Sequence, residues 1–199
     1  MGTPVSYRFS SGRQVQRPRE MIKGLHVAGE RIILDETILT AVQSHVGGTI
    51  GHRGDAGDSL EWLCLRGTGV QGPWVLWLMS WWKFTHGRVG GFRWQRVEPT
   101  AQFDSRCQTL PDGRGGVELP IALQLGIVQS QVLRILGQPS KRVGHTLLYR
   151  HEHEVTIKNQ LFKTLNTMAV ILRGQAVWAT EAWRHGNHQQ FEVLISAGR

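Results

Sequence analysis

The residues of this chain that could ligate a metal are concentrated in the segment Arg150–Glu154, which alternates histidine and glutamate after an arginine. In an extended strand His151 and His153 would share one face, with the two glutamates on the other. A zinc site needs three or four protein ligands, so two imidazoles are incomplete. His185 and His188 are the nearest further donors, and their spacing gives no reason to place them beside the strand. We therefore predict no metal site, with His151 and His153 as the only candidates.

Nucleophilic chemistry would fall to Cys64 or Cys107, paired with one of the nine histidines. No local signature of a Cys–His enzyme surrounds either cysteine, and the glycines form no strand–loop–helix cradle for a phosphate. We predict a non-enzymatic protein without a cofactor, and a small enzyme with an unrecognised site is the third-ranked reading. A disulfide between the two cysteines stays open, although a reducing compartment would argue against it.

The eight tryptophans are the most unusual feature of the composition. Trp77 and Trp81 have a parity opposite to that of Trp74 and Trp82, so in one strand the two pairs face opposite sides of a sheet. Tryptophan and arginine are frequent hot spots of protein interfaces. The alternative, weighed evenly, is that other parts of the chain cover both faces. The candidate partner-binding residues are Trp77, Trp81, Arg93, Arg96, Arg150, Trp178 and Arg184.

The formal net charge of +8 is unevenly distributed. Residues 1–23 hold five basic residues and one acidic residue, so they contribute 5 − 1 = 4 charges and the rest of the chain contributes 8 − 4 = 4. Half of the net positive charge therefore lies in an N-terminal leader. This weakens the case for a basic surface that binds nucleic acid on the rest of the chain. The same charge would complement an acidic protein. We expect an acidic protein partner, with nucleic acid as the second choice and no membrane.

Apolar periodicity predicts the elements that position these residues. In the first half we expect an extended segment at 29–34, a helix from the N-cap Asp35 through Val46, and strands at 60–65, 74–84 and 89–97. The second half is expected to hold an extended segment at 117–121, a helix at 127–136, and strands at 146–155, 161–172 and 176–183. Between them, residues 98–116 are rich in Pro and Gly and read as a connector.

The two halves match at a nearly constant offset, which is typical of tandem structural units. Gly57 and Gly87 lie 87 residues before Gly144 and Gly174, since 144 − 57 and 174 − 87 both equal 87. The alternative is that the two halves are unrelated α+β segments, and that the constant offset arises from aligning them by choice.

Particular residues of the second half also resemble a known family. They are Leu119-Pro120-Ile121 before the helix, Gly126-Ile127 at its start, and Val132-Leu133 with Ile135-Leu136-Gly137-Gln138-Pro139 at its end. These residues resemble the beta-lactamase-inhibitor-protein-like fold, which small outer-membrane barrel-assembly lipoproteins share. The resemblance covers about 117–183 and is weaker over 29–97, where Gly47-Gly48 has no following proline. It implies a helical element against an antiparallel sheet, in tandem copies, as in inhibitors and immunity proteins of bacterial toxin systems.

Together these observations predict an α+β fold of two tandem units, each with short helices packed on an antiparallel sheet of about three to four strands. The predicted boundaries are a basic flexible leader at 1–24, a first repeat at 25–97, the connector at 98–116 and a second repeat at 117–199. The predicted function is protein binding, as a bacterial immunity or inhibitor protein that occludes the active site of a cognate toxin or enzyme. The alternative is a nucleic-acid-associated accessory protein that uses the leader and an aromatic sheet face. The absence of a signal-peptide core in the first residues leads us to expect a cytoplasmic chain.

Overall fold

The computed structural model describes residues 21–55, 59–98, 106–111, 116–157 and 160–184, with side chains except at 153–164. The strands of these ranges are β1 Gly24–Val27, β2 Glu30–Ile33, β3 Ile50–Arg53, β4 Leu60–Gly69, β5 Gly72–Trp81, β6 Gly91–Arg96, β7 Gln108–Thr109, β8 Val117–Glu118, β9 Lys141–Val143, β10 Thr146–Ile157, β11 Gln160–Arg173 and β12 Ala176–Arg184. The helices are α1 Leu39–Val46, α2 Trp82–Thr85 and α3 Gln129–Leu136.

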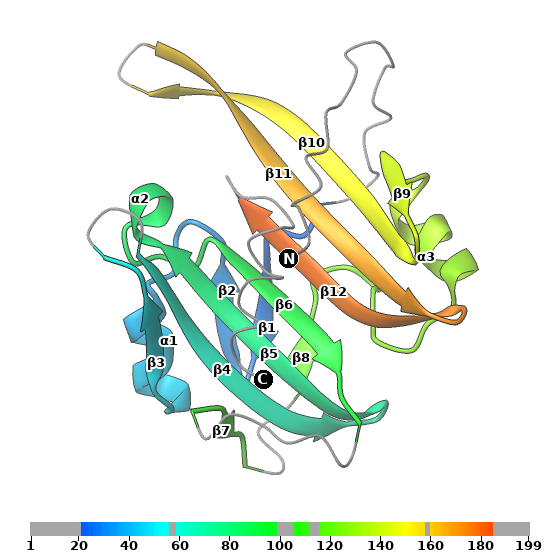
Figure 1. The fold of residues 1–199 in the computed structure, drawn as a ribbon, viewed down its shortest axis with the longest axis horizontal. Helices are drawn as coiled ribbons and strands as arrows, with labels where there is room; N and C mark the ends of the chain where they lie inside the picture. Colours follow the sequence, from blue (N-terminus) through cyan, green and yellow to red (C-terminus); the bar gives the residue numbers. More distant parts are fainter. Residues whose placement is uncertain (1–20, 56–58, 99–105, 112–115, 158–159, 185–199) are drawn as a thin grey trace, which may run out of the picture.

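Most of the strands belong to one large twisted sheet, seen face-on in Figure 1. Its strand order is β3-β4-β5-β6-β12-β11-β10-β9, with antiparallel neighbours throughout, and the short β7 pairs with β4 in parallel. Strands β2, β1 and β8 form a separate small sheet, with β1 in the middle. The described chain is therefore mostly β.

The large sheet is continuous because the last strand of each half pairs with the other. Strand β6 runs antiparallel to β12, from Gly91 opposite Trp183 to Gln95 opposite Ala179. The prediction of an α+β fold, with two tandem units of three to four strands each, is therefore wrong. Backbone N–H and C=O groups at the edge of each half find their partners across this seam, where two separate sheets would have left two unpaired edges.

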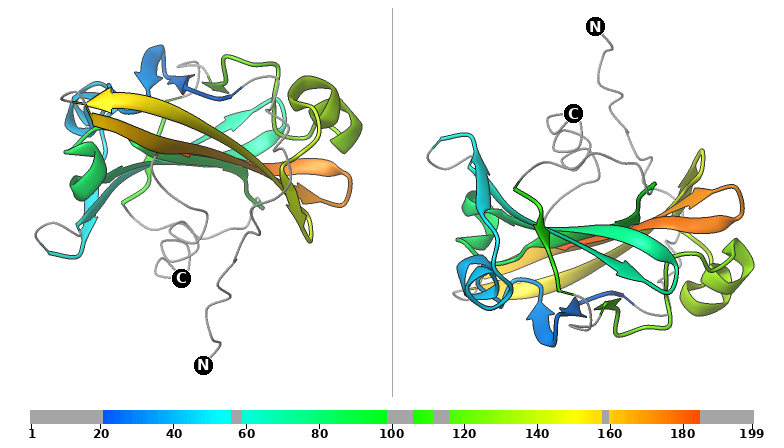
Figure 2. Two further views of the ribbon diagram at one scale, coloured as in Figure 1. Left: turned by 90° about the horizontal axis from the view of Figure 1, so that it is seen from above. Right: turned by 90° about the horizontal axis from the view of Figure 1, so that it is seen from below.

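The helices α1 and α3 and the small sheet lie on the same side of the large sheet, as both views in Figure 2 show. We call the side that they cover the inner face and the opposite side the outer face. Alternate residues of the central strands point to the inner face and are buried there, as Leu76, Phe92 and Val170 illustrate. Val132 and Leu136 contribute the apolar stripe of α3 to the same core.

One local hydrogen-bond arrangement occurs twice. The amide of Leu39 at the start of α1 donates to the carbonyl of Gly87, and the amide of Gln129 at the start of α3 donates to the carbonyl of Gln175. Both helices also end at a glycine with a φ of 81°. Each helix thus begins against the turn between the last two strands of its own half.

Helix α3 begins within two residues of the predicted start, whereas α1 begins later than predicted. Asp35 is not the N-cap of α1; that position belongs to Ile38. Asp35 instead has a φ of 67°, a conformation that aspartate tolerates better than most residues. Its carboxylate lies 3.9 Å from Nε of Arg184 at the end of β12. A contact distant in sequence therefore overrides the local capping preference of this residue.

The predicted leader and connector both contribute ordered elements. Ile22 is buried and Gly24 begins β1, so the end of the predicted leader is part of the fold. Within the connector, β7 pairs with β4 and the neighbouring Leu110 is buried. The rest of the leader, the middle of the connector and the chain beyond 184 lie outside the described residues. In the described ranges, no helix has the length and apolarity that crossing a lipid bilayer requires.

Tyr149 of β10 ties the main sheet to the end of α3. Its side chain is buried, and its hydroxyl donates a hydrogen bond to the carbonyl of Gly137 at 3.3 Å. Burial disfavours the phenolate and raises the pKa of Tyr149 from 10.0 to about 12.

We expect this raised pKa to make the protein less stable at high pH. Below pH 10 both the folded and the unfolded state keep the phenol proton, whereas between pH 10 and 12 the unfolded state loses it first. The free energy of unfolding should therefore fall with rising pH in this window, by about 1 kcal/mol per pH unit. Urea unfolding of the wild type and of Tyr149→Phe at pH 9 and 11.5 measures the difference. Equal pH dependence of the two proteins would refute the assignment.

Candidate functional site

Three tryptophans lie on the outer face of strands β4 and β5. Trp62 of β4 lies opposite Met79, which stands midway between Trp77 and Trp81 along β5. Residues two positions away from a cross-strand partner are diagonal neighbours, close enough for aromatic side chains to touch. We call Trp62, Trp77 and Trp81 the tryptophan stripe. Each of its members is partly exposed.

The prediction that Trp77 and Trp81 face away from Trp74 is confirmed within β5, but the prediction for Trp82 is wrong. Trp74 is buried in the inner core, whereas Trp77 and Trp81 pack against outer-face residues. Trp82 is not part of the strand, because the chain turns into α2 at that residue, and its side chain is 47% exposed. The indoles are therefore neither all sealed inside nor all on one surface.

A disulfide holds the connector against the stripe. Cys64 of β4 is bonded to Cys107, 43 residues later, and both residues are buried beside Val75 and Trp77. The residue before the second cysteine, Arg106, places its guanidinium 5.5 Å from the ring centre of Trp62. This arrangement brings a cation to one end of the stripe. Because both cysteines are oxidised, neither is available as a thiol nucleophile.

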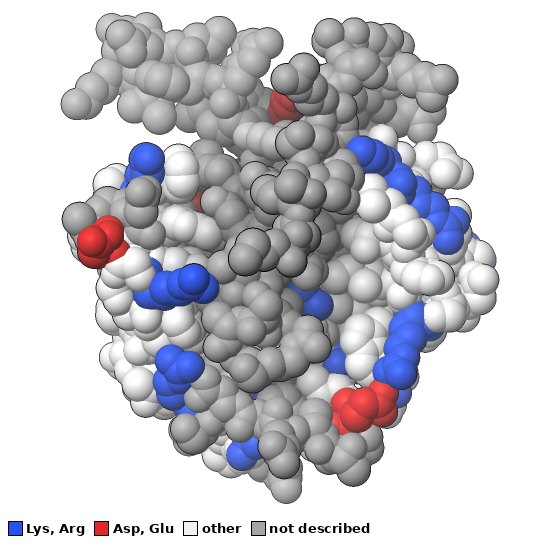
Figure 3. All heavy atoms as spheres, in the orientation of Figure 1, with Lys and Arg blue, Asp and Glu red and all other residues white. Residues whose placement is uncertain are grey.

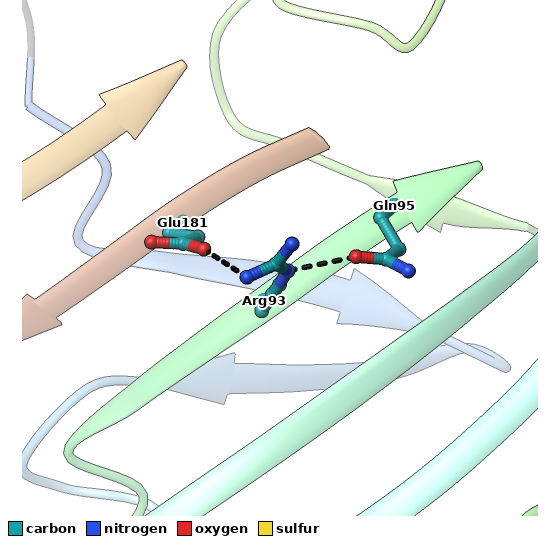
Figure 4. Close-up of polar contacts among 3 residues, drawn as sticks. All are labelled: Arg93, Gln95 and Glu181. Carbon is teal, nitrogen blue, oxygen red and sulfur yellow. Dashed lines mark hydrogen bonds and ion pairs between the residues drawn. The ribbon is translucent and has the colours of Figure 1, made fainter. Parts of the chain in front are cut away.

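Beside the stripe, at the seam of the sheet, lies a buried ion pair. Arg93 of β6 is directly opposite Glu181 of β12, and their side chains meet at 2.8 Å. Nε of Arg93 also donates to Oε1 of Gln95 at 2.8 Å, as Figure 4 shows. Glu181 is completely buried and Arg93 is only 9% exposed. Arg93, a predicted partner-binding residue, thus has most of its surface occupied within the fold.

Arg150 and Arg184 end up on opposite faces. Arg150 is opposite Thr167 on the outer face, and burial lowers the pKa of its guanidinium while the nearby Glu152 carboxylate partly offsets this. Arg184 is opposite Asn166 on the inner side, donates to that amide oxygen at 3.2 Å, and lies near the Asp35 carboxylate. Of these two candidates, only Arg150 shares a face with the tryptophan stripe.

Trp178 and Arg96 form a separate cluster at the far end of β12. Trp178 lies at a β-bulge, where the pairing of β11 and β12 shifts by one residue. The guanidinium of Arg173 lies 4.6 Å from the Trp178 ring centre and that of Arg96 lies 5.8 Å from it. Arg173 is also ion-paired with Glu98, and both side chains are more than half exposed. This pair is solvent-screened and contributes little to stability.

Basic side chains dominate the charge on the described flanks of the outer face. Figure 3 looks onto this face and shows Lys and Arg side chains along both flanks, with fewer Asp and Glu side chains among them. Such a distribution attracts an acidic partner and accelerates its encounter with the protein.

Only one of the candidate metal residues, His151, has a described side chain. His151 is partly buried and lies opposite Asn166, while the side chain of His153 is outside the described part of the structure, as are His185 and His188. Among the described residues, no three His, Cys, Asp or Glu side chains come together as a metal site would require.

Three residues of this region were missing from the sequence-based candidates. Trp62 could have been included, because it shares a face with Leu60 and Cys64 in a predicted strand. Glu181 also carried a signal, since it is a single carboxylate in the apolar strand Ala176–Arg184. Arg106 had none, because its position depends on the disulfide.

No protein-family model, curated protein or solved structure matches this chain. The resemblance of residues 117–183 to the beta-lactamase-inhibitor-protein-like fold therefore stays a prediction.

Proposed function

We propose that this chain is a non-enzymatic protein-binding module that docks on an acidic partner through the tryptophan stripe. The observation that carries the proposal is the stripe itself: three indoles, all partly exposed, on one face of a sheet. Large aromatic side chains with little conformational freedom make favourable anchors, because little entropy is lost when they are buried at an interface. Arg106, and Arg150 on the same face, supply positive charge.

The specific role that we propose is inhibition by occlusion, in which the stripe and its neighbouring loops fill the active-site cleft of a bacterial toxin or enzyme. This role draws support from the resemblance of residues 117–183 and from the basic outer face. A fold of two tandem units would have supported this inhibitory role, but the large sheet is continuous and gives no such support. The proposal therefore depends on the chemistry of the outer face rather than on two repeated units.

The disulfide is evidence about the compartment in which the protein would meet its partner. Disulfides persist in oxidising compartments and are rare in the cytosol. The cytoplasmic location predicted from the N-terminal residues therefore has the Cys64–Cys107 bond against it. We propose that the partner is met in an oxidising environment.

The test is affinity purification from nuclease-treated extract of the source organism, with wild type and variants immobilised in parallel. We expect wild type to retain one acidic protein in a one-to-one ratio, and Trp77→Ser/Trp81→Ser to lose it. Val70→Ser is the matched control, because Val70 is a fully exposed apolar residue at the β4–β5 hairpin tip. Retention by the double variant, or equal loss from the control, would contradict the proposal.

Nucleic-acid binding is the second candidate, and the basic flanks of the outer face favour it. Stacked single strands also use indole platforms between cations. Fluorescence anisotropy with a labelled single-stranded oligonucleotide separates the two candidates. Nucleic-acid binding predicts an affinity that falls steeply between 50 and 200 mM salt, roughly in proportion to the number of phosphate contacts. We expect no salt-sensitive binding of this kind.

A further inference from the structure

A cavity of about 540 Å³ opens between the tip of the β4–β5 hairpin and the segment 116–125 that follows the connector. It lies on the inner side of the large sheet, because its walls include the inner-face residues Trp74 and Trp94. Leu123 and Leu125 form part of the opposite wall. This volume is in the range of natural small-molecule sites.

The hairpin tip is held against the second wall of the cavity. Gly126, next to that wall, has a φ of 87°, and a β-carbon there would lie 2.6 Å from Oε1 of Gln71 at the tip. The end of the Gln71 side chain therefore lies against the backbone at Gly126, and the positive φ of this residue favours glycine. The two walls are in contact at this point, so the cavity has a defined shape in the folded protein.

The side chains that line the cavity indicate what it would bind. Trp74 and Trp94 both line the cavity and give it aromatic surface. Glu118 supplies a carboxylate, and Gln71 and Gln124 supply carboxamides. None of the described lining residues is Lys or Arg, although the chain has 23 of them.

We propose that this cavity binds a small, uncharged, ring-containing molecule that packs against Trp74 and Trp94. Its apolar walls favour a flat hydrophobic body. The Glu118 carboxylate, with no cation beside it among the described lining residues, disfavours any anion. This site is separate from the tryptophan stripe, which lies on the outer face, so the proposal does not depend on the proposed function.

Two matched probes test the chemistry of the site. Coumarin is a neutral ring compound with a carbonyl acceptor, and coumarin-3-carboxylate adds one negative charge. In titrations followed by ligand-observed NMR and calorimetry, we expect coumarin to bind with one-to-one stoichiometry and the carboxylate to bind at least 10-fold more weakly. Glu118→Gln should reduce this discrimination. Absence of coumarin binding at millimolar concentration, or equal affinity for both probes, would overturn the proposal.

Two matched variants test the location. Ala122 is an exposed residue of the cavity wall, so Ala122→Trp should fill the cavity and abolish coumarin binding. Ala41→Trp is the control, because Ala41 is equally exposed but lies on α1, away from the cavity. Trp94→Phe replaces the indole of the cavity wall with a smaller ring, and should weaken binding about 5-fold. Undiminished binding by Ala122→Trp, or loss in both tryptophan variants, would show that the probe binds elsewhere.

Discussion

Removing the Cys64–Cys107 disulfide is expected to lower the free energy of unfolding by about 4 kcal/mol. The bond closes a loop between residues 43 apart, and the chain-entropy relation for a loop of that length gives this magnitude. The loss is a large part of the 5–15 kcal/mol that a typical domain has. Urea unfolding of Cys64→Ala/Cys107→Ala against the oxidised wild type measures it. A loss below about 1 kcal/mol would contradict the expectation.

The loss should be concentrated at one edge of the sheet. Strand β7 pairs with β4 over only two residues, and the amide of Leu110 donates to the carbonyl of Arg66 next to it. Without the disulfide, we expect amide hydrogens of Gln108 to Leu110 to exchange much faster, while those of β10 and β11 keep their relative protection. Thiol labelling of the chain taken directly from cells should show both cysteines oxidised. Free thiols at both positions would contradict an oxidising environment and would indicate a reducing compartment instead.

The second large effect is expected at the Arg93–Glu181 pair. Glu181→Ala would leave the Arg93 guanidinium buried without the carboxylate that now lies 2.8 Å away, and should cost about 3–5 kcal/mol. Replacing both residues by apolar side chains removes the buried charge altogether, so Arg93→Met/Glu181→Met should recover most of that loss. The coupling energy follows from the double-mutant cycle in urea. Additive losses in the two single variants would contradict the expectation.

This pair also has a structural role at the seam. Arg93 and Glu181 are directly opposite each other in the strand pairing that joins the two halves of the sheet. A one-residue slip of β6 against β12 would move the Arg93 side chain to the inner face, against the apolar core, and leave Glu181 without it. We therefore expect the pair to specify the register of β6 and β12 as well as to stabilise it.

The strands that follow from local alternation were predictable from the sequence. The predicted strands at 146–155, 161–172 and 176–183 correspond to β10, β11 and β12, each of which is one or two residues longer than predicted. Their boundaries are encoded locally, by β-branched and aromatic residues between turn signals such as Gly144 and Gly174. The opposite facing of Trp74 and Trp77 followed from the same period of two.

The arrangement of the strands was not predictable, because it depends on partners distant in sequence. No local feature of residues 91–96 indicates that this strand pairs with residues 179–183. The pairing of β1 with β8 likewise joins segments about 90 residues apart. The sequence left the disulfide open, and Arg106 owes its place beside Trp62 to that bond. Trp82 left the sheet because the chain turned earlier than its apolar run suggested.

The most direct test of the docking role is the affinity of the purified partner for wild type and for Trp77→Ser/Trp81→Ser, measured by calorimetry. Truncating two interface anchors, each contributing about 2 kcal/mol or more, should weaken binding at least ~100-fold while the variant keeps its fold by circular dichroism. If the folded double variant binds the partner as tightly as the wild type does, the tryptophan stripe is not the docking surface.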